Sequence, residues 1–382
     1  MDKSFNADSF NIDEELEKIN KKISKPNILV CGATGVGKSS FVNDVFGKCV
    51  AKVGEGAPIT RGVKRYEDKE LSVVLYDSEG YEIGEDKQYY FKEEIIGVID
   101  KCKQEYPTEL NKQIHEVWYF ISAANKRVTE TDIEVVNLIK EKKVPIAIVV
   151  TQIDNVDEKE LNDICSTIEM EFRDIRYFTV CVTDDKDIAE AVEIYNQKQQ
   201  LIEWALENLS NSLKDGFIVS LHNNLEIVKK HVNKVIVPSY IASAIAASAV
   251  PIPLADAAML TPIQLSMSVH IMKVYGIDNY KSAITGVINS SIVSQIGKTL
   301  AKTLIGNVAK LIPGFGSVVG GLINSSVAGT LTASIGYAIS ELSYRYSQSV
   351  VEGKAIPLTE IFDSEIIRET INNFYKQEAK SE

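Results

Sequence analysis

The first half of the chain alternates short apolar runs with longer stretches of helical periodicity. The apolar runs lie at 27–31, 71–76, 117–121, 145–151 and 177–182, and helical patterns fill about 38–47, 89–103, 129–142, 158–173 and 186–212. Strands that alternate with helices are typical of right-handed crossover units around a parallel sheet. The segment 63–68 (VKRYED) alternates apolar and polar residues, which predicts an antiparallel edge strand beside 71–76.

After about residue 212 the pattern contains no convincing strand, and we predict that only helices follow. The helix over 186–212 is expected to connect the two halves. Residues 13–23 place Leu16, Ile19 and Ile23 among charges and predict a short amphipathic helix. The predicted organisation is an N-terminal helical extension (1–24), an α/β domain with a mostly parallel sheet between helices (25–212) and an all-α C-terminal domain (213–382).

Two uncharged stretches in the C-terminal half leave two interpretations open. Residues 235–255 contain three prolines, and residues 311–340 contain six glycines together with many small polar residues. The second stretch is long enough to span a bilayer, and its small residues permit close helix packing. Pro313 and the glycines interrupt it, so the tightly packed core of a soluble domain fits equally well. A peripheral or integral membrane association and a soluble core therefore both remain hypotheses.

Composition and charge narrow the class of protein. With 382 residues, of which 45% are hydrophobic and 25% charged, the chain can bury a sizeable core. A net charge of −12 argues against a broad electrostatic grip on nucleic acid, so no nucleic-acid partner is expected. The five cysteines have neither disulfide-framework nor metal-site spacing. The polar, acidic N-terminus has no hydrophobic signal core, and a cytoplasmic location is expected.

A phosphate-binding loop follows the first predicted strand. The sequence GATGVGKS at 32–39 fits G-x-x-x-x-G-K-S/T and opens a predicted helix, which is the context that gives this motif its meaning. Glycines let the backbone N–H groups approach phosphates, and the helix N-terminus adds positive potential. Lys38 would reach the β- and γ-phosphates, and Ser39 would coordinate Mg²⁺. The nucleotide-binding candidates here are Gly32, Ala33, Thr34, Gly35, Val36, Gly37, Lys38, Ser39 and Ser40.

With the segments that follow, the chain resembles the translation-factor-related class of P-loop GTPases, including its Era-like and TrmE-like members, over about residues 25–210. Thr60 in GAPITRG matches the switch I threonine of that class, and Asp77 and Gly80 in DSEG match its D-x-x-G box. The resemblance implies that Thr60 and Asp77 join Ser39 around Mg²⁺. It also implies that Thr60 and Gly80 sense the γ-phosphate and release the switch loops after hydrolysis.

The base-reading box is TQID at 151–154, at the end of an apolar run. The Asp154 carboxylate can accept from N1–H and from the N2 amino group of guanine, whereas adenine lacks that amino group and presents a lone pair at N1. Asp154 is therefore the main reason to expect GTP rather than ATP, with Thr151 and Gln152 beside it. Gln152 replaces the lysine usual in the class, so the stacking stem remains and the cation is lost. Near Cys181 the sequence VCVT replaces a common Ser-Ala pair, and no base contact is assigned there.

The residues that usually position the attacking water are absent. Tyr81 follows D-x-x-G where many small GTPases have glutamine, and Gly35 stands where dynamin-like relatives have serine. Slow intrinsic turnover is expected unless a partner, a second copy or a switch II carboxylate supplies the missing group. The switch II candidates are Glu79, Glu82 and Glu85; their alternative is a solvated acidic face. Arg61 and Arg65 either stabilise transition-state charge or are ordinary surface arginines.

The stretch 251–277 resembles the signature of a helical domain of unknown function that follows GTPase domains in bacteria. The arrangement is similar in outline to immunity-related and dynamin-like GTPases. Asp256 and Gln264 lie in apolar sequence and are expected to make structural hydrogen bonds, and His270 is expected on a helix face.

The expected function is Mg²⁺-dependent hydrolysis of GTP to GDP and phosphate, with the helical domain acting as a switch or as an assembly element. The alternative is a nucleotide-binding scaffold with negligible turnover. Expected partners are GTP, a second copy across the nucleotide face, and a membrane or an effector protein.

Overall fold

The computed structural model describes residues 11–47, 57–58, 63–67, 73–78, 85–221, 224–248, 256–277 and 320–381. The chain forms two compact units. The sheet unit comprises Ile23–Asn223, and the helical unit comprises Met1–Lys22 together with Asn224–Glu382. The fold class predicted from the pattern, an α/β domain followed by helices, is confirmed, whereas the domain limits proposed from the sequence stay a prediction.

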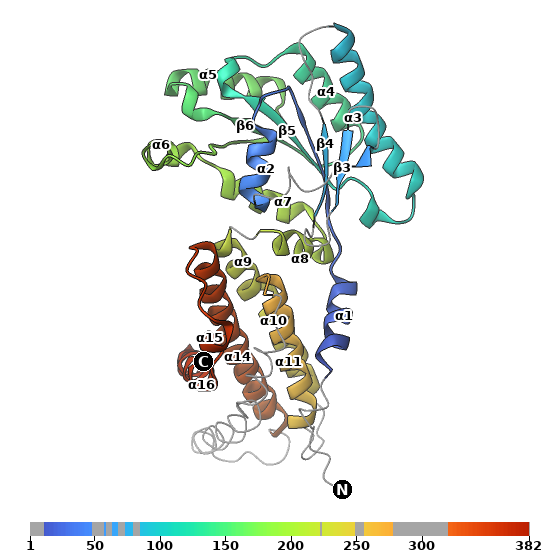
Figure 1. Cartoon of the computed structure of the whole chain (residues 1–382). Coiled ribbons are helices and arrows are strands. Elements are labelled where there is room, and N and C mark those ends of the chain that lie inside the picture. Colours follow the sequence, from blue (N-terminus) through green and yellow to red (C-terminus); the bar gives the residue numbers. More distant parts are fainter. Residues whose placement is uncertain are drawn as a thin grey trace. The chain divides into compact units, whose positions relative to one another are not determined.

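A seven-stranded sheet forms the centre of the sheet unit, with the order β2-β3-β4-β1-β5-β6-β7 among the described residues (Figure 1). Strands β4, β1, β5, β6 and β7 are parallel, and β2 and β3 are antiparallel to their neighbours. The strands are β1 (Asn27–Gly32), β2 (Ala57–Pro58), β3 (Val63–Tyr66), β4 (Val74–Ser78), β5 (Glu116–Ser122), β6 (Ile146–Thr151) and β7 (Arg176–Thr179).

Helices pack on both faces of this sheet. Successive strand residues point to opposite faces, so apolar strands present apolar side chains on both sides, and both sides need to be covered. On one face Val117, Tyr119 and Ile121 pack with α3, α4 and α5 in a single core cluster. On the other, Trp118 contacts Phe41 and Phe46 of α2 and Phe217 of α8. The helices of the unit are α2 (Lys38–Phe46), α3 (Glu85–Glu105), α4 (Glu130–Glu141), α5 (Glu158–Glu171), α6 (Lys186–Val192), α7 (Lys198–Asn208) and α8 (Asn211–Val219).

Two details of the predicted sheet are wrong. Strand β4 begins at Val74 rather than near 71, so Asp77 lies inside the strand. Strand β3 is antiparallel to β4 as predicted, but it is not at the edge, because Ala57 and Pro58 pair with its outer side. A two-residue segment with a proline gives no sequence signal for a strand.

The helix predicted over 186–212 is also wrong, because three helical pieces and two breaks replace it. Between α6 and α7 the chain forms a 3₁₀ turn, η5 (Glu193–Tyr195), and then hydrogen-bonds to β7. The Gln197 N–H donates to the Thr179 carbonyl at 2.7 Å, and the Gln197 side chain accepts from the Thr179 N–H at 3.2 Å. Buried strand edges need such partners, so the edge strand interrupts the helix.

The helical unit contains seven helices among the described residues, and α14 is the longest of them. They are α1 (Ile12–Lys22), α9 (Leu225–His231), α10 (Val237–Ser248), α11 (Asp256–Val274), α14 (Gly320–Val351), α15 (Leu358–Ile361) and α16 (Ser364–Ser381). A π-turn at Val232–Ile236 joins α9 to α10. Pro238 follows this turn and has no N–H for a hydrogen bond to a carbonyl of the preceding turn. The wider π geometry leaves room for the proline ring beside that carbonyl.

Small residues let α10 and α11 approach α14 closely. A Cβ on Gly336 would lie 2.8 Å from a Val237 methyl carbon and 2.9 Å from the Met267 sulfur. The Gln264 amide is 1% exposed and donates to the Thr332 hydroxyl at 3.2 Å, which confirms the predicted structural hydrogen bond.

The described part of 311–340 from Ala328 onward is almost entirely buried among other helices. None of the described helices is both long and apolar enough to cross a membrane.

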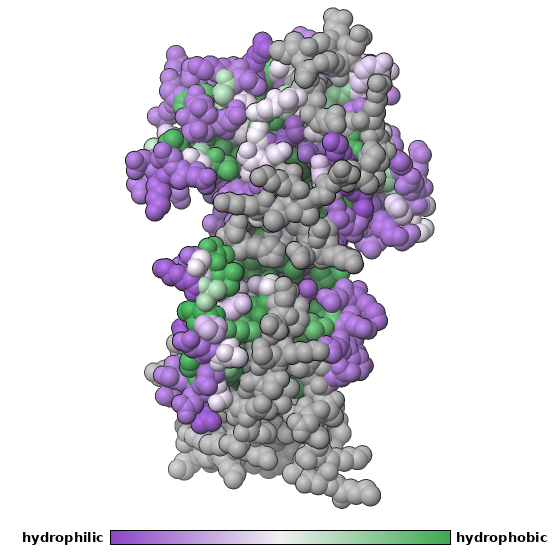
Figure 2. Space-filling model, in the orientation of Figure 1, coloured by the Kyte–Doolittle hydropathy of each residue, from purple (hydrophilic) through white to green (hydrophobic). Residues whose placement is uncertain are grey.

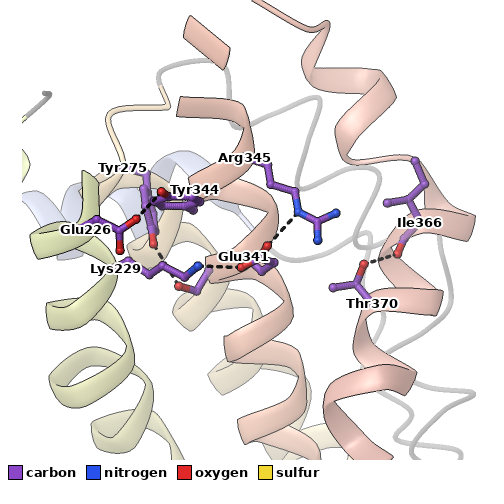
Figure 3. A network of polar contacts seen from close by, with 9 residues as sticks. Glu226, Lys229, Tyr275, Glu341, Tyr344, Arg345, Ile366 and Thr370 are labelled. Atoms are coloured by element: carbon purple, nitrogen blue, oxygen red, sulfur yellow. Dashed lines mark hydrogen bonds and ion pairs between the residues drawn. The ribbon is translucent and has the colours of Figure 1, made fainter. Parts of the chain in front are cut away.

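Polar contacts join α9, α11 and α14 at one end of the helical unit (Figure 3). The Lys229 ammonium lies 2.9 Å from the Glu341 carboxylate and 4.2 Å from the centre of the Tyr344 ring. The Arg345 guanidinium contacts the same carboxylate at 2.9 Å. Just after α11, the Tyr275 hydroxyl lies 3.1 Å from the Ser340 hydroxyl. The C-terminal end of α11 is thereby fixed against α14.

Strand β5 begins with a buried carboxyl group, that of Glu116. Glu116 is 0% exposed, and the Trp118 indole N–H donates to it at 3.2 Å. Burial raises the pKa of the Glu116 carboxyl from 4.5 to about 8, although the indole N–H favours the charged form. Because the folded state holds this proton more tightly, the contribution of the Glu116 proton to stability is fully present below pH 4.5 and is lost as the pH rises toward 8.

We therefore expect Glu116→Gln, which stays neutral, to remove much of the stability loss between pH 4.5 and 8. Thermal unfolding of both proteins across this range measures the effect, at ~2–4 °C in Tm for each kcal/mol. Glu171→Gln, at an exposed position, is the matched control. Parallel pH profiles of wild type and Glu116→Gln would contradict a neutral buried carboxyl.

Candidate nucleotide-binding site

The phosphate-loop candidates form a tight turn between β1 and α2. Gly32 has φ +143°, and a Cβ there would lie 2.4 Å from the Phe120 carbonyl oxygen, so no other residue fits without movement of β5. Gly35 and Gly37 have φ +78° and +88°, a region that L side chains rarely adopt. Among the other residues of the loop, Ala33 is half-buried, Thr34 is exposed and Val36 is buried.

Lys38 is the first residue of α2, and its side chain folds back into the loop. Its ammonium donates to the carbonyls of Gly32 at 3.0 Å and Ala33 at 2.9 Å. Burial lowers the pKa of this ammonium, and the nearby Asp77 carboxylate opposes the change. The cation is thus held at the centre of the loop, where phosphate oxygens would replace or share its carbonyl partners.

The N-terminus of α2 is suited to bind an anion. Gly37 is its N-cap residue, and no described side chain caps the first turn. The first N–H groups of a helix lack intrahelical partners, so such an end binds phosphate well. The hydroxyl-bearing Ser39 and Ser40 lie exposed in this turn.

Asp77 lies near the end of β4, which pairs directly with β1. The residue is half-buried, and its charge raises the pKa of Lys38. A carboxylate beside the phosphate-loop lysine suits the oxygen ligands that Mg²⁺ prefers. Of the three predicted metal-binding residues, the structure describes Ser39 and Asp77.

Two residues of the base box hold the phosphate loop from the side of β6. The Thr151 hydroxyl donates to the Val36 carbonyl at 2.6 Å. The Gln152 amide donates to the Gly35 carbonyl at 3.2 Å, and its oxygen accepts from the Ser122 hydroxyl. Gln152 has φ +55°, which aims its side chain back at the loop. An uncharged amide thus ties the base box to the loop where the class usually has a lysine.

Asp154 projects from the 3₁₀ turn η4 (Ile153–Asn155) and is exposed. The Asn155 amide contacts one carboxylate oxygen at 3.2 Å, and the Cys181 thiol contacts the other at 3.6 Å. Burial and the Asp154 charge raise the pKa of the Cys181 thiol to about 11, so the thiol stays protonated and donates. These two contacts fix the orientation of the carboxylate that was predicted to read guanine.

Sequence analysis missed Cys181 and Ser122 as contributors to this site. Each follows or ends a buried strand next to β6, and carboxyl ends of parallel strands meet at one edge of the sheet. The position of both residues at strand ends beside β6 could have indicated a role in the site. For Cys181 this was missed because VCVT replaces the common Ser-Ala pair, and a thiol within an apolar run resembles a core residue.

Several predicted residues lie outside the described part of the chain. They are Thr60, Gly80, Tyr81, Glu79, Glu82 and Arg61, and the side chain of Glu85 at the start of α3 also lies outside it. Arg65 is described on β3, where it pairs with Glu67 and donates to the Tyr76 hydroxyl at 3.3 Å. This environment fits the ordinary surface arginine of the two alternatives.

Two family models match separate parts of the chain. Residues 27–152 match the 50S ribosome-binding GTPase family. Residues 220–363 match a domain of unknown function, DUF697. The first match contains the phosphate loop, Asp77 and the start of the base box, and the second falls largely in the helical unit.

Individual relatives match the sheet unit. A probable GTP-binding protein EngB of Mycoplasmopsis synoviae (strain 53) is 29% identical over 141 residues, 36% of this chain and 70% of the relative. The GTPase Era of Clostridioides difficile (strain 630) is 27% identical over 147 residues, 38% of this chain. The chain spans 46% of the length of that Era relative.

A crystal structure of a probable GTP-binding protein EngB aligns with 48% of this chain and 97% of its own, at a TM-score of 0.33 and 16% identity. The family matches and the sequence relatives carry the assignment. Residues 27–152 therefore belong to a GTP-binding P-loop GTPase domain with EngB-like and Era-like relatives, and residues 220–363 belong to a C-terminal helical domain of the DUF697 family.

Proposed function

We propose that the chain hydrolyses GTP to GDP and phosphate with Mg²⁺ and acts as a nucleotide-dependent switch. The observation that carries this proposal is the pairing of the Lys38-centred phosphate loop with the oriented Asp154 carboxylate. The loop supplies backbone N–H groups, a cation and an uncapped helix end for phosphates. Asp154 supplies an acceptor pair for the guanine edge.

Mg²⁺ would be held by the Ser39 hydroxyl and the Asp77 carboxylate, with Thr60 as the third proposed ligand. The bound cation would neutralise charge that develops on the transferred phosphoryl group. The chain's own residues position the nucleotide: Lys38 holds the phosphates, and Thr151 and Gln152 hold the loop itself. The Gly80 N–H would sense the γ-phosphate.

Turnover would be slow for an isolated chain, because Tyr81 and Gly35 occupy the positions from which related enzymes place the attacking water. An effector protein, a second copy across the nucleotide face or a switch II carboxylate would supply the missing group. The helical unit would change its position or its self-association with the nucleotide state. Association with a membrane surface belongs to this proposal, with the chain otherwise in the cytoplasm.

A nucleotide-binding scaffold with negligible turnover is the second candidate. Gln152 favours it, because an amide replaces the lysine of the base box and yet holds the loop closed through Ser122 and Gly35. Such a site would bind GTP and GDP without a catalytic partner. The two candidates differ in phosphate release rather than in binding.

Replacement of Lys38 by alanine should weaken GTP binding ~10- to 100-fold, which corresponds to the loss of one or more charge-assisted hydrogen bonds. Titration with a fluorescent GTP analogue measures the dissociation constant. Lys159→Ala removes an exposed lysine of α5 and serves as the control. Equal affinities of Lys38→Ala and wild type would reject the loop as the phosphate site.

Replacement of Asp154 by asparagine should weaken GTP binding ~10-fold or more and improve binding of xanthosine triphosphate, whose O2 accepts where guanine donates. Competition with GTP, ATP and xanthosine triphosphate measures the change in base preference. Asp163→Asn, on the exposed side of α5, should leave the preference unchanged. A wild-type preference for ATP would refute the role of Asp154.

Phosphate release per molecule should rise with protein concentration if assembly completes the catalytic site. The measurement is steady-state GTPase activity over a wide concentration range, with and without liposomes. Lys38→Ala controls for contaminating phosphatases. Tight GTP binding without release under every condition would refute the enzyme and favour the scaffold.

A further inference from the structure

The outer edge of the sheet at β7 borders a hollow that the nucleotide site does not use. The hollow has a volume of about 510 Å³ and lies between the end of α5, strand β7 and the start of α7. The buried rings of Phe172 and Phe178 form part of its apolar floor, and Arg173, Arg176 and Gln200 lie on its exposed rim. No residue of the phosphate loop or of the base box lines it.

The backbone of β7 leaves one residue open toward this hollow. The Val180 N–H donates inward to the Val150 carbonyl at 2.7 Å, whereas both backbone groups of Thr179 bond outward to Gln197. Backbone groups alternate in direction along a parallel strand, so the N–H and carbonyl of Tyr177 also point outward. Among the described residues they have no hydrogen-bond partner. Gln197 therefore pairs with the far end of the edge, at Thr179, and does not pair with Tyr177.

The rim of the hollow is basic in a chain that is acidic overall. Neither Arg173 nor Arg176 forms an ion pair with a described residue. The Glu169 carboxylate also lines the hollow, but one of its oxygens accepts from the Tyr177 hydroxyl at 2.7 Å. Among the residues that line the hollow, two guanidinium groups outnumber one carboxylate, so the lining has a small excess of positive charge. The coloured surface of the sheet unit in Figure 2 is mostly hydrophilic, with smaller hydrophobic areas among the hydrophilic residues.

We propose that the β7 edge is a docking site for an extended acidic peptide segment of a partner protein. The peptide pairs its backbone with Tyr177 as a short added strand, its carboxylates contact Arg173 and Arg176, and an apolar side chain enters the hollow over Phe172. Addition of a strand to an exposed edge is a common mode of peptide recognition, in which the backbone provides affinity and the pockets provide specificity. This site is independent of the proposed GTPase function.

The competing explanation is that both arginines only protect the edge. Charged residues on short edge strands prevent unwanted pairing between sheets. A protected edge would repel all peptides or ignore their charge, whereas a docking site would discriminate between them. The two explanations therefore give opposite results with matched peptides.

The test uses the full chain with bound GDP and Mg²⁺ and a dye-labelled peptide of sequence TVDVEVD. Fluorescence anisotropy measures affinity, and the backbone amide signal of Tyr177 in an NMR spectrum reports the location. The acidic peptide should bind and shift this signal. The lysine analogue TVKVKVK should bind ~10-fold or more weakly, because it places like charges beside the arginines. Of two peptides N-methylated at odd or at even residues, at least one should lose binding.

The variant Arg173→Glu/Arg176→Glu should bind the acidic peptide ~10-fold or more weakly than wild type. Its affinity for the GTP analogue should be unchanged, which shows that the sheet unit is folded. Arg173→Gln/Arg176→Gln repeats the test without reversed charge. Lys159→Glu/Lys186→Glu, at exposed positions elsewhere, is the matched charge control.

Absence of binding by TVDVEVD, or equal binding by the acidic and the lysine peptides, would overturn the proposal and leave the arginines as edge protection. Binding that survives Arg173→Glu/Arg176→Glu would also overturn it. Sedimentation of the full chain examines another occupant. If wild type is a dimer and the double variant is a monomer, the edge receives a second copy rather than an acidic partner.

Discussion

The close approach of Gly32 to β5 is the constraint on which the nucleotide site depends. At this point the backbone of β1 runs so near the Phe120 carbonyl that a methyl group would overlap it. The chain can therefore leave the sheet and turn at once into the phosphate loop. Lys38 then reaches back to the carbonyls of Gly32 and Ala33, and α2 starts with its N–H groups toward the same point. A bulkier residue at 32 would displace the loop, the lysine and the helix end together.

The same edge of the sheet gathers the remaining parts of the site. Asp77 lies near the end of the strand on one side of β1. On the other side, Ser122 and Thr151 end β5 and β6, and Cys181 follows β7. Their hydrogen bonds to loop carbonyls and to Asp154 join phosphate and base recognition in one layer of contacts. These contacts are possible because the carboxyl ends of the parallel strands meet at one edge of the sheet. Phosphate geometry and base geometry are thus coupled through the backbone of the loop.

Much of this could be predicted from the sequence, because the signals were local. The motif around Lys38 requires only its flanking strand and helix, and the apolar runs place five of the strands. Other features depend on distant partners. The break at Gln197 exists because Thr179 lies on a strand edge, and the role of Cys181 exists because η4 brings Asp154 to it. Neither partner is visible in the sequence near the residue concerned. Strand β2 was missed because two residues carry no periodicity.

In the helical unit, two polar contacts specify the register between α11 and α14. The Gln264–Thr332 hydrogen bond and the Tyr275–Ser340 contact both join α11 to α14, at different heights along the pair. Around Gly336 the helices pack so closely that a Cβ would overlap Val237 and Met267. A shift by one helical turn, about 5.4 Å, would break both polar contacts at once and leave a buried amide unsatisfied. The two contacts therefore specify a single axial position of α11 along α14.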